Sequence, residues 1–215
     1  MLSTSRRAGV IVALALVAGG ASFAVQPTAH AAALPSASAL IHGTDWRVAS
    51  TGTVVAFTGE MYNSWGVYNP HVGQASLFVA VASVQKVVHW SGELGYEGAG
   101  YLTQSRRIDT LTLSDGAHAP ATFAVVKHLT DRELVAYAVV SADRIEAHGL
   151  NDIVRTGWET LIGTKSPYYL VSVSVPDPTS AYDAQAGRIA TSLLTPVLQG
   201  LRADARAVAD TRQSQ

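Results

Sequence analysis

The sequence predicts an α+β domain: a mainly antiparallel sheet with helices packed on one face and a long amphipathic helix at the C-terminus. Strand-like segments come first along the chain and helical patterns follow them, without strict alternation of the two. The C-terminal segment repeats its apolar residues with a period near 3.6 residues, as an amphipathic helix does. A content of 48% hydrophobic and 14% charged residues is typical of a packed fold.

The first residues carry the three parts of a bacterial export signal. Arg6 and Arg7 supply the positive region, residues 8–18 the apolar stretch, and Ala29-His30-Ala31 a small-residue cleavage site. The apolar stretch is too short to cross a bilayer, so a cleaved signal over residues 1–31 is favoured over a membrane anchor. General secretion is favoured over twin-arginine export, which the arginine pair leaves open. We therefore expect a secreted or envelope-associated protein.

The rest of the chain is large enough for one domain with a sizeable core. The predicted layout is a flexible leader over residues 32–44, a single domain over 45–201 and a frayed tail over 202–215. Beyond residue 31 there are 13 basic and 16 acidic residues, a net charge of −3, which argues against a nucleic-acid partner. The absence of cysteine excludes disulfides, a thiolate nucleophile and lipid attachment through cysteine. No later apolar run reaches the length of a transmembrane segment.

β-branched and aromatic residues dominate five segments, which are therefore predicted as strands. These segments are residues 53–58, 75–88, 108–113, 123–127 and 134–141. Residues 59–73 are predicted as a loop, because glycine, asparagine and proline recur there. Segment 134–141 could equally be a short buried helix, since an apolar run of this length does not distinguish the two. A sixth strand, residues 168–175, places Leu170, Ser172 and Ser174 on one side and its other residues on the opposite side.

Two segments have apolar residues at helical spacing. Residues 150–162 are predicted as a helix, although Gly157 weakens the pattern by about 1 kcal/mol relative to alanine. Residues 182–201 show the clearer pattern, and Ser180 with Asp183 resembles a capping pair before it. Pro196 suits the first turn of a helix, so two helices are as plausible as one kinked helix.

The candidate binding residues are aromatic side chains in two glycine- or asparagine-rich stretches. Flat rings on loops can stack on sugars or peptides, while Asn63, Asn69, Glu93 and Glu97 could supply hydrogen bonds. The alternative is that the rings fold inward as a small core beneath the loops. The candidates are Tyr62, Trp65, Tyr68, His71, Trp90, Tyr96 and Tyr101.

Motifs for catalysis match only in part. Ser83-Val84-Gln85-Lys86 has the Ser-x-x-Lys spacing, but a strand places Ser83 and Lys86 on opposite faces and the companion motifs are missing. The histidines lack metal-ligand spacing, so neither a metal nor a cofactor is predicted. The glycine-rich residues 95–100 are predicted as a connection between strands rather than a phosphate-binding loop.

The segment Tyr168-Tyr169-Leu170-Val171-Ser172-Val173-Ser174-Val175-Pro176, with the helix through Ile189-Ala190-Thr191-Ser192-Leu193-Leu194, resembles the closing strand and helix of actinobacterial LpqN-like and PsbP-like envelope proteins. The resemblance implies an antiparallel sheet covered by helices, in a binding or assembly factor rather than an enzyme. It carries over no functional residue.

The sequence thus predicts a non-enzymatic binding domain for a cell-wall glycan, a peptide or another envelope protein. The alternative is a secreted hydrolase, because serine, histidine and aspartate from separate segments could still meet in space. No Gly-x-Ser-x-Gly motif marks a nucleophile for it.

Overall fold

The computed structural model describes residues 34–55, 61–82, 93, 96–97, 99–147 and 168–213. They form an eight-stranded antiparallel sheet with a long C-terminal helix packed against it, which confirms the predicted α+β class. The strands are β1 (Arg47–Val55), β2 (Met61–Asn69), β3 (Gly73–Ala82), β4 (Leu102–Thr112), β5 (His118–His128), β6 (Asp131–Val140), β7 (Ile145–Glu146) and β8 (Tyr168–Pro176), and the helices are α2 (Ala37–Leu40) and α6 (Ala184–Gln213).

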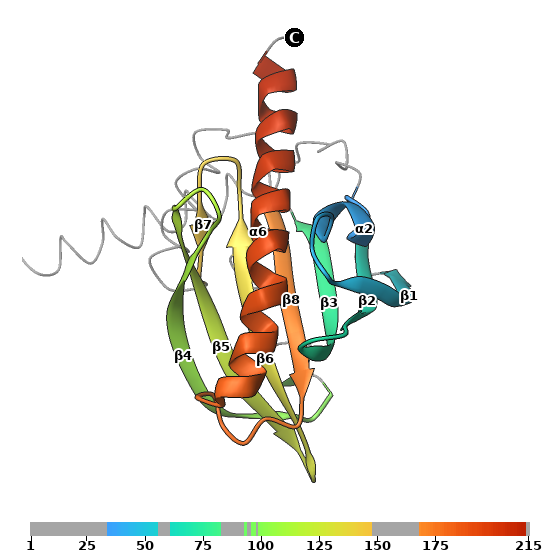
Figure 1. Ribbon diagram of the computed structural model, residues 1–215, viewed down its shortest axis with the longest axis vertical. Coiled ribbons are helices and arrows are strands. Elements are labelled where there is room, and N and C mark those ends of the chain that lie inside the picture. Colours follow the sequence, from blue (N-terminus) through green and yellow to red (C-terminus); the bar gives the residue numbers. More distant parts are fainter. Residues whose placement is uncertain are drawn as a thin grey trace, which may run out of the picture.

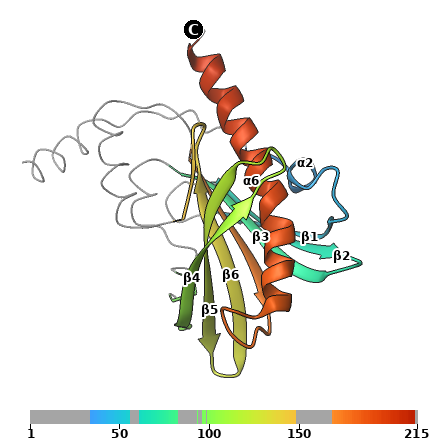
Figure 2. The same ribbon diagram turned by 60° about the vertical axis from the view of Figure 1, so that its left-hand side comes forward.

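The sheet has the strand order β1-β2-β3-β8-β6-β5-β4, with β7 paired to β6. Strand β8 is inserted between β3 and β6, so the two halves of the sheet are joined by a strand from late in the chain. Helix α6 lies across β8 and β6 in the middle of one face, and α2 lies beside it toward β1 (Figures 1 and 2). Among the described residues, both helices thus cover the same face, as predicted.

The core lies between α6 and the sheet. Leu193, Leu194, Val197, Leu198 and Leu201 of α6 are fully buried and belong to the same cluster as the apolar side chains on this face of the sheet. Their spacing gives the helix one continuous apolar stripe. Burial of each such side chain stabilises the fold by about 1.5–3 kcal/mol.

The alternation predicted for β8 is confirmed. Tyr169, Val171, Val173 and Val175 pack in the α6 cluster, whereas Tyr168 and Leu170 pack in a separate cluster on the other face. Seven residues of the strand are buried and one, Ser172, is partly buried. Strand β8 is therefore covered on both faces, as expected for the middle of a sheet.

Helix α6 begins behind Asp183, whose carboxylate accepts hydrogen bonds from the backbone N–H groups of Gln185 (3.0 Å) and Ala186 (2.9 Å). The Thr179 backbone N–H (3.0 Å) and hydroxyl (2.8 Å) also donate to it. These hydrogen bonds, from Thr179 and then Ala186, hold the pKa of Asp183 well below its usual range. Asp183 is therefore the helix cap, whereas the Ser180 hydroxyl accepts from the Tyr182 N–H at 3.2 Å.

Helix α6 is longer than predicted. It is a single helix that includes Pro196, so it is not divided in two at that residue. Residues 202–213, predicted as a frayed tail, continue it: Ala205 is fully buried, and the Asp204 carboxylate accepts a hydrogen bond from the Tyr169 hydroxyl. Contacts with the sheet thus extend the helix past its apolar stripe, and its C-terminal end projects beyond the strands (Figure 1).

Residues 36–41 differ from the flexible leader predicted over 32–44. The Ser36 hydroxyl caps α2 by accepting from the Ala39 N–H at 3.3 Å. Ala37, Leu40 and Ile41 are buried in the same cluster as α6. The short helix is thus held by tertiary packing, which a four-residue pattern does not reveal.

Strand β2 differs from the prediction of a loop over residues 59–73. It pairs with β1 on one side and β3 on the other, although it contains Asn63, Ser64 and Gly66. Pairing on both sides overrides the low strand propensity of these residues. Gly66 lies close to β1, because a Cβ atom there would lie 2.5 Å from Ser50 Oγ and would displace that hydroxyl.

The other predicted strands are confirmed in position but not in length. Residues 108–113 and 123–127 belong to the longer strands β4 and β5, and residues 134–140 lie in β6, so the helical alternative for that segment is wrong. Residues 53–55 and 75–82 lie in β1 and β3. The predicted export signal, the predicted helix over 150–162 and the Ser83–Lys86 motif lie outside the described residues. No helix in the described part of the chain has the length and apolar character needed to cross a membrane.

Substitution of Gly66 tests the close approach of β2 to β1. We expect Gly66→Ala to lower the free energy of unfolding by about 1–2 kcal/mol, because the new methyl group overlaps the Ser50 hydroxyl. In a Ser50→Ala background the same substitution should be nearly neutral. Urea unfolding of the four proteins of this double-mutant cycle measures the coupling, and equal effects in both backgrounds would contradict the assignment.

Candidate ligand-binding site

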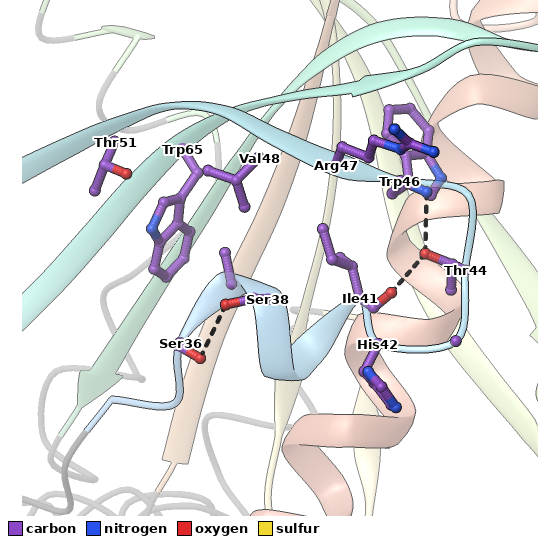
Figure 3. Close-up of a pocket in the computed structure, with 12 residues that line it drawn as sticks. Ser36, Ser38, Ile41, His42, Thr44, Trp46, Arg47, Val48, Thr51 and Trp65 are labelled. Atoms are coloured by element: carbon purple, nitrogen blue, oxygen red, sulfur yellow. Dashed lines mark hydrogen bonds between the residues drawn. The ribbon is translucent and has the colours of Figure 1, made fainter.

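An open cleft of about 500 Å³ lies between helix α2 and the adjoining strands β1 and β2 (Figure 3). Its size is within the range of small-ligand and side-chain pockets. Twelve residues line it: Ser36, Ala37, Ser38, Ile41, His42, Gly43, Thr44, Trp46, Arg47, Val48, Thr51 and Trp65. All but Trp65 come from one continuous segment, residues 36–51.

Apolar side chains face each other across the cleft. Trp65 and Val48 point from the sheet toward α2, and Ile41 points back from the end of α2 (Figure 3). Trp65 is 5% exposed and Val48 is 38% exposed, so the walls run from buried core to open surface. The cleft therefore has a covered apolar base and one exposed apolar side chain, Val48, with polar side chains around them.

A bulge in β1 shapes the side of the cleft that is formed by the sheet. The register with β2 shifts between Val48 and Ser50, so Val48 lies opposite Val67 and Thr51 opposite Trp65. Val48 and Thr51 line the cleft, whereas Ala49 and Ser50 between them do not. The extra residue thus separates two cleft-facing side chains by more than an ordinary strand would.

The turn between α2 and β1 is fixed by local hydrogen bonds. The Thr44 hydroxyl donates to the Ile41 carbonyl at 2.7 Å and accepts from the Trp46 backbone N–H at 3.2 Å (Figure 3). On the other side of α2, Gly200 of α6 allows close contact, since a Cβ atom there would lie 3.2 Å from Leu40 Cδ2. The C-terminal end of α2 is therefore held in place, by the turn that leads to β1 on one side and by α6 on the other.

The Trp46 indole N–H has no hydrogen-bond acceptor among the described residues, although Trp46 is only 4% exposed. A buried donor without an acceptor costs about 1–3 kcal/mol of stability. Functional sites are a common place for such a group. The indole N–H of Trp46 is therefore a buried donor at the cleft for which the described residues provide no acceptor.

Of the predicted binding residues, the structure places Trp65 alone in the cleft lining, and Trp65 is buried. Tyr68 is 42% exposed on β2, and His71 lies in the exposed turn after it. Tyr62 pairs within β2, and Trp90 lies outside the described residues. Among the described candidates, Trp65 thus lies in the cleft lining and Tyr68 at an exposed position of the same strand. Trp46, Val48 and the α2 residues were not predicted as binding residues. The one signal for them in the sequence was Trp46, an aromatic residue close to β-branched residues.

Tyr96 and Tyr101 belong to a different cluster, on the sheet face opposite α6. The two rings meet edge to face at 5.3 Å, and Tyr101 lies 5.2 Å from the His128 ring. The Tyr96 hydroxyl donates to the Glu133 carboxylate at 2.6 Å, and the Ser174 hydroxyl donates to the same group. These rings fold inward against Val126, Val135 and Tyr137, which is the alternative considered from the sequence.

Glu93 is a charged residue that is fully buried beside this cluster. Its carboxylate pairs with Arg106, whose Nε donates at 3.0 Å, and accepts from the hydroxyls of Tyr137 (3.3 Å) and Thr103 (3.4 Å). Two carboxylate–tyrosine pairs therefore connect to the sheet with donor and acceptor exchanged. Glu93 accepts a hydrogen bond from Tyr137 of the sheet, and Tyr96 donates one to Glu133 of the sheet. Together they attach Glu93 and Tyr96 to β6.

This environment raises the pKa values of the Tyr96 and Tyr137 hydroxyl groups. Burial, with the hydrogen bond to Glu133, raises the pKa of Tyr96. Burial, with the charge of Glu93, raises the pKa of Tyr137 to about 12. In both pairs the carboxylate accepts the hydrogen bond and the tyrosine hydroxyl keeps its proton.

The described residues contain no assembled catalytic group of the predicted kind. The four described histidine side chains, His42, His71, His118 and His128, form no hydrogen bond or ion pair. The Ser174 hydroxyl donates to a carboxylate, with no histidine to take its proton. Within the same residues, no group of three or more His, Asp or Glu side chains is placed to hold a metal ion.

The described residues form a cysteine-free α+β domain with an open cleft that is lined by both apolar and polar side chains. Comparisons of the chain with protein-family models, with curated proteins and with solved structures find no match.

The tyrosine pairs predict a loss of stability at high pH. The folded-state pKa of Tyr137 is about 12, above the unfolded value of about 10, so its contribution is complete below pH 10 and is lost as the pH rises toward 12. We expect the free energy of unfolding to fall over this interval by on the order of 1–2 kcal/mol more in the wild type than in Tyr137→Phe. The exposed Tyr182→Phe is the control, and urea unfolding from pH 8 to 12 is the measurement. Parallel curves for wild type and Tyr137→Phe would contradict the interpretation.

Proposed function

We propose that the protein is an exported binding domain whose ligand places an apolar group in the α2–β1 cleft. The observation that carries this proposal is the open cleft walled by Trp65, Val48 and Ile41. Trp65 and Ile41 are only 5% and 4% exposed and form the covered base of the cleft, whereas Val48, at 38% exposed, gives it an apolar edge at the surface.

The lining favours an apolar ligand group over a glycan. Sugar hydroxyls are bound mainly by carboxylate and amide side chains, together with exposed ring faces. None of the twelve lining residues is Asp, Glu, Asn or Gln, and the Trp65 ring is mostly covered. Hydroxyl groups of Ser36, Ser38 and Thr51 are available at the rim for a few orienting hydrogen bonds. A peptide or an envelope protein therefore fits better than a cell-wall glycan.

The site is supported by rigid elements, as binding sites require. Trp65 lies on β2, which is paired on both sides, and α2 is packed against α6. The predicted cleavage after Ala31 would leave every lining residue in the exported chain. Export and an intact cleft are therefore compatible.

Binding of the neutral dye Nile red tests the proposal. Its fluorescence rises in an apolar site, so we expect saturable binding to the purified protein. Ser38→Trp should weaken this binding at least tenfold, because Ser38 is an exposed lining residue and indole would fill the cleft. Thr110→Trp, an exposed position on β4, is the matched control and should bind as wild type.

Circular dichroism of each variant separates loss of the site from loss of the fold. Equal Nile red binding by wild type and a folded Ser38→Trp would sink the proposal. Retention of the protein on purified peptidoglycan, undiminished in Ser38→Trp, would favour the glycan ligand instead.

A further inference from the structure

Strand β1 is an open end of the sheet beside the cleft. Among the described residues it pairs with β2 alone, and none of them pairs with the backbone donors and acceptors of its other edge. Residues 47–51 are all exposed, and after Val48 they are the small residues Ala49, Ser50 and Thr51. The cleft opens along this same stretch. A backbone edge and a side-chain pocket therefore lie next to each other.

We propose that an extended peptide adds to β1 as a further strand and places one apolar side chain in the cleft. This inference rests on the proposed function, and it names the ligand class of that site. In such strand addition the main-chain hydrogen bonds give affinity and the pockets for alternate side chains give specificity.

The geometry of a sheet fits this arrangement. An added strand lies about 4.8 Å from its neighbour, and its alternate side chains point to the two faces. Those that point to the α6 face meet the space between β1 and α2. The bulge at Ala49 separates Val48 from Thr51 along this stretch, which leaves room for a side chain of the added strand between them.

The opposite end strand, β4, has a different character. It contains the charged residues Arg106, Arg107 and Asp109 in its centre, and charges on an edge strand oppose further pairing. Strand β1 has one charged residue, Arg47, at its start. Within the described part of the chain, the sheet is therefore protected at the β4 end and open at the β1 end.

The lining also specifies the partner. It includes His42 and Arg47 but no acidic residue, which favours an uncharged or acidic peptide over a basic one. A second copy of this chain fits less well. Among residues 47–51 the β1 edge offers only Val48 as an apolar side chain of size, and Val48 already forms a wall of its own cleft. Two paired copies would leave both clefts empty.

The probes are five blocked nonapeptides, acetyl-(Thr-Ser)2-X-(Ser-Thr)2-amide, in which X is leucine, isoleucine, valine, phenylalanine or tryptophan. Their binding to the purified protein is measured by titration calorimetry. We expect at least one to bind, with at least a tenfold loss when X is replaced by glycine. Each amide of the best peptide is then N-methylated in turn. Methylation of alternate amides should weaken binding at least tenfold, and methylation of the others should have little effect, because only every second amide faces β1.

Two variants locate the site. Val48→Lys, on the β1 edge, should abolish peptide binding, and Ile108→Lys, an exposed position on the β4 edge, should leave it unchanged. If none of the five peptides binds while Nile red still binds in a Ser38-dependent manner, the cleft function stands and the peptide inference is wrong. N-methylation effects without alternation would also overturn strand addition. Sedimentation that shows a dimer lost in Val48→Lys would make a second copy the occupant and overturn the inference.

Discussion

The packing of α6 across β8 and β6 is the interaction on which the rest of the structure depends. It covers the middle of the sheet, where the strand from late in the chain joins the two halves. The five fully buried residues of its apolar stripe together contribute on the order of 10 kcal/mol, comparable to the net stability of a domain. Helix α2 is too short to be stable alone and is held against α6. The cleft therefore exists only because α6 fixes one of its walls.

The elements that the sequence predicts well are those with a strong period. The apolar stripe of α6 and the alternation of β8 each lie in one segment, so both can be recognised without knowledge of the fold. Strand β2 could not be recognised in this way. Its asparagine, serine and glycine residues favour a turn, and its strand form depends on β1 and β3 pairing with it on either side. The extension of α6 past Leu201 likewise depends on Tyr169 and the sheet.

The candidate site was harder to predict than the fold. Aromatic residues close in sequence were expected to share a surface, but a strand sends neighbouring side chains to opposite faces. Trp65 points toward α2, whereas Tyr68 is exposed elsewhere on β2, and Tyr96 lies beneath the other face with Glu133. The cleft also needs α2, whose four residues carry no readable period. A pocket between elements that are distant in sequence leaves no local pattern.

The contact between Leu40 and Gly200 joins the first and last helices of the described chain. A chain that is synthesised from its N-terminus presents the lining residues, 36–51 and Trp65, long before α6 is available. Until then α2 has no surface to pack against, and the cleft has only its sheet side. Assembly of the cleft is in this way tied to completion of the chain. A nascent or C-terminally truncated protein would carry the residues of the site without the helix that holds them in the shape of a cleft.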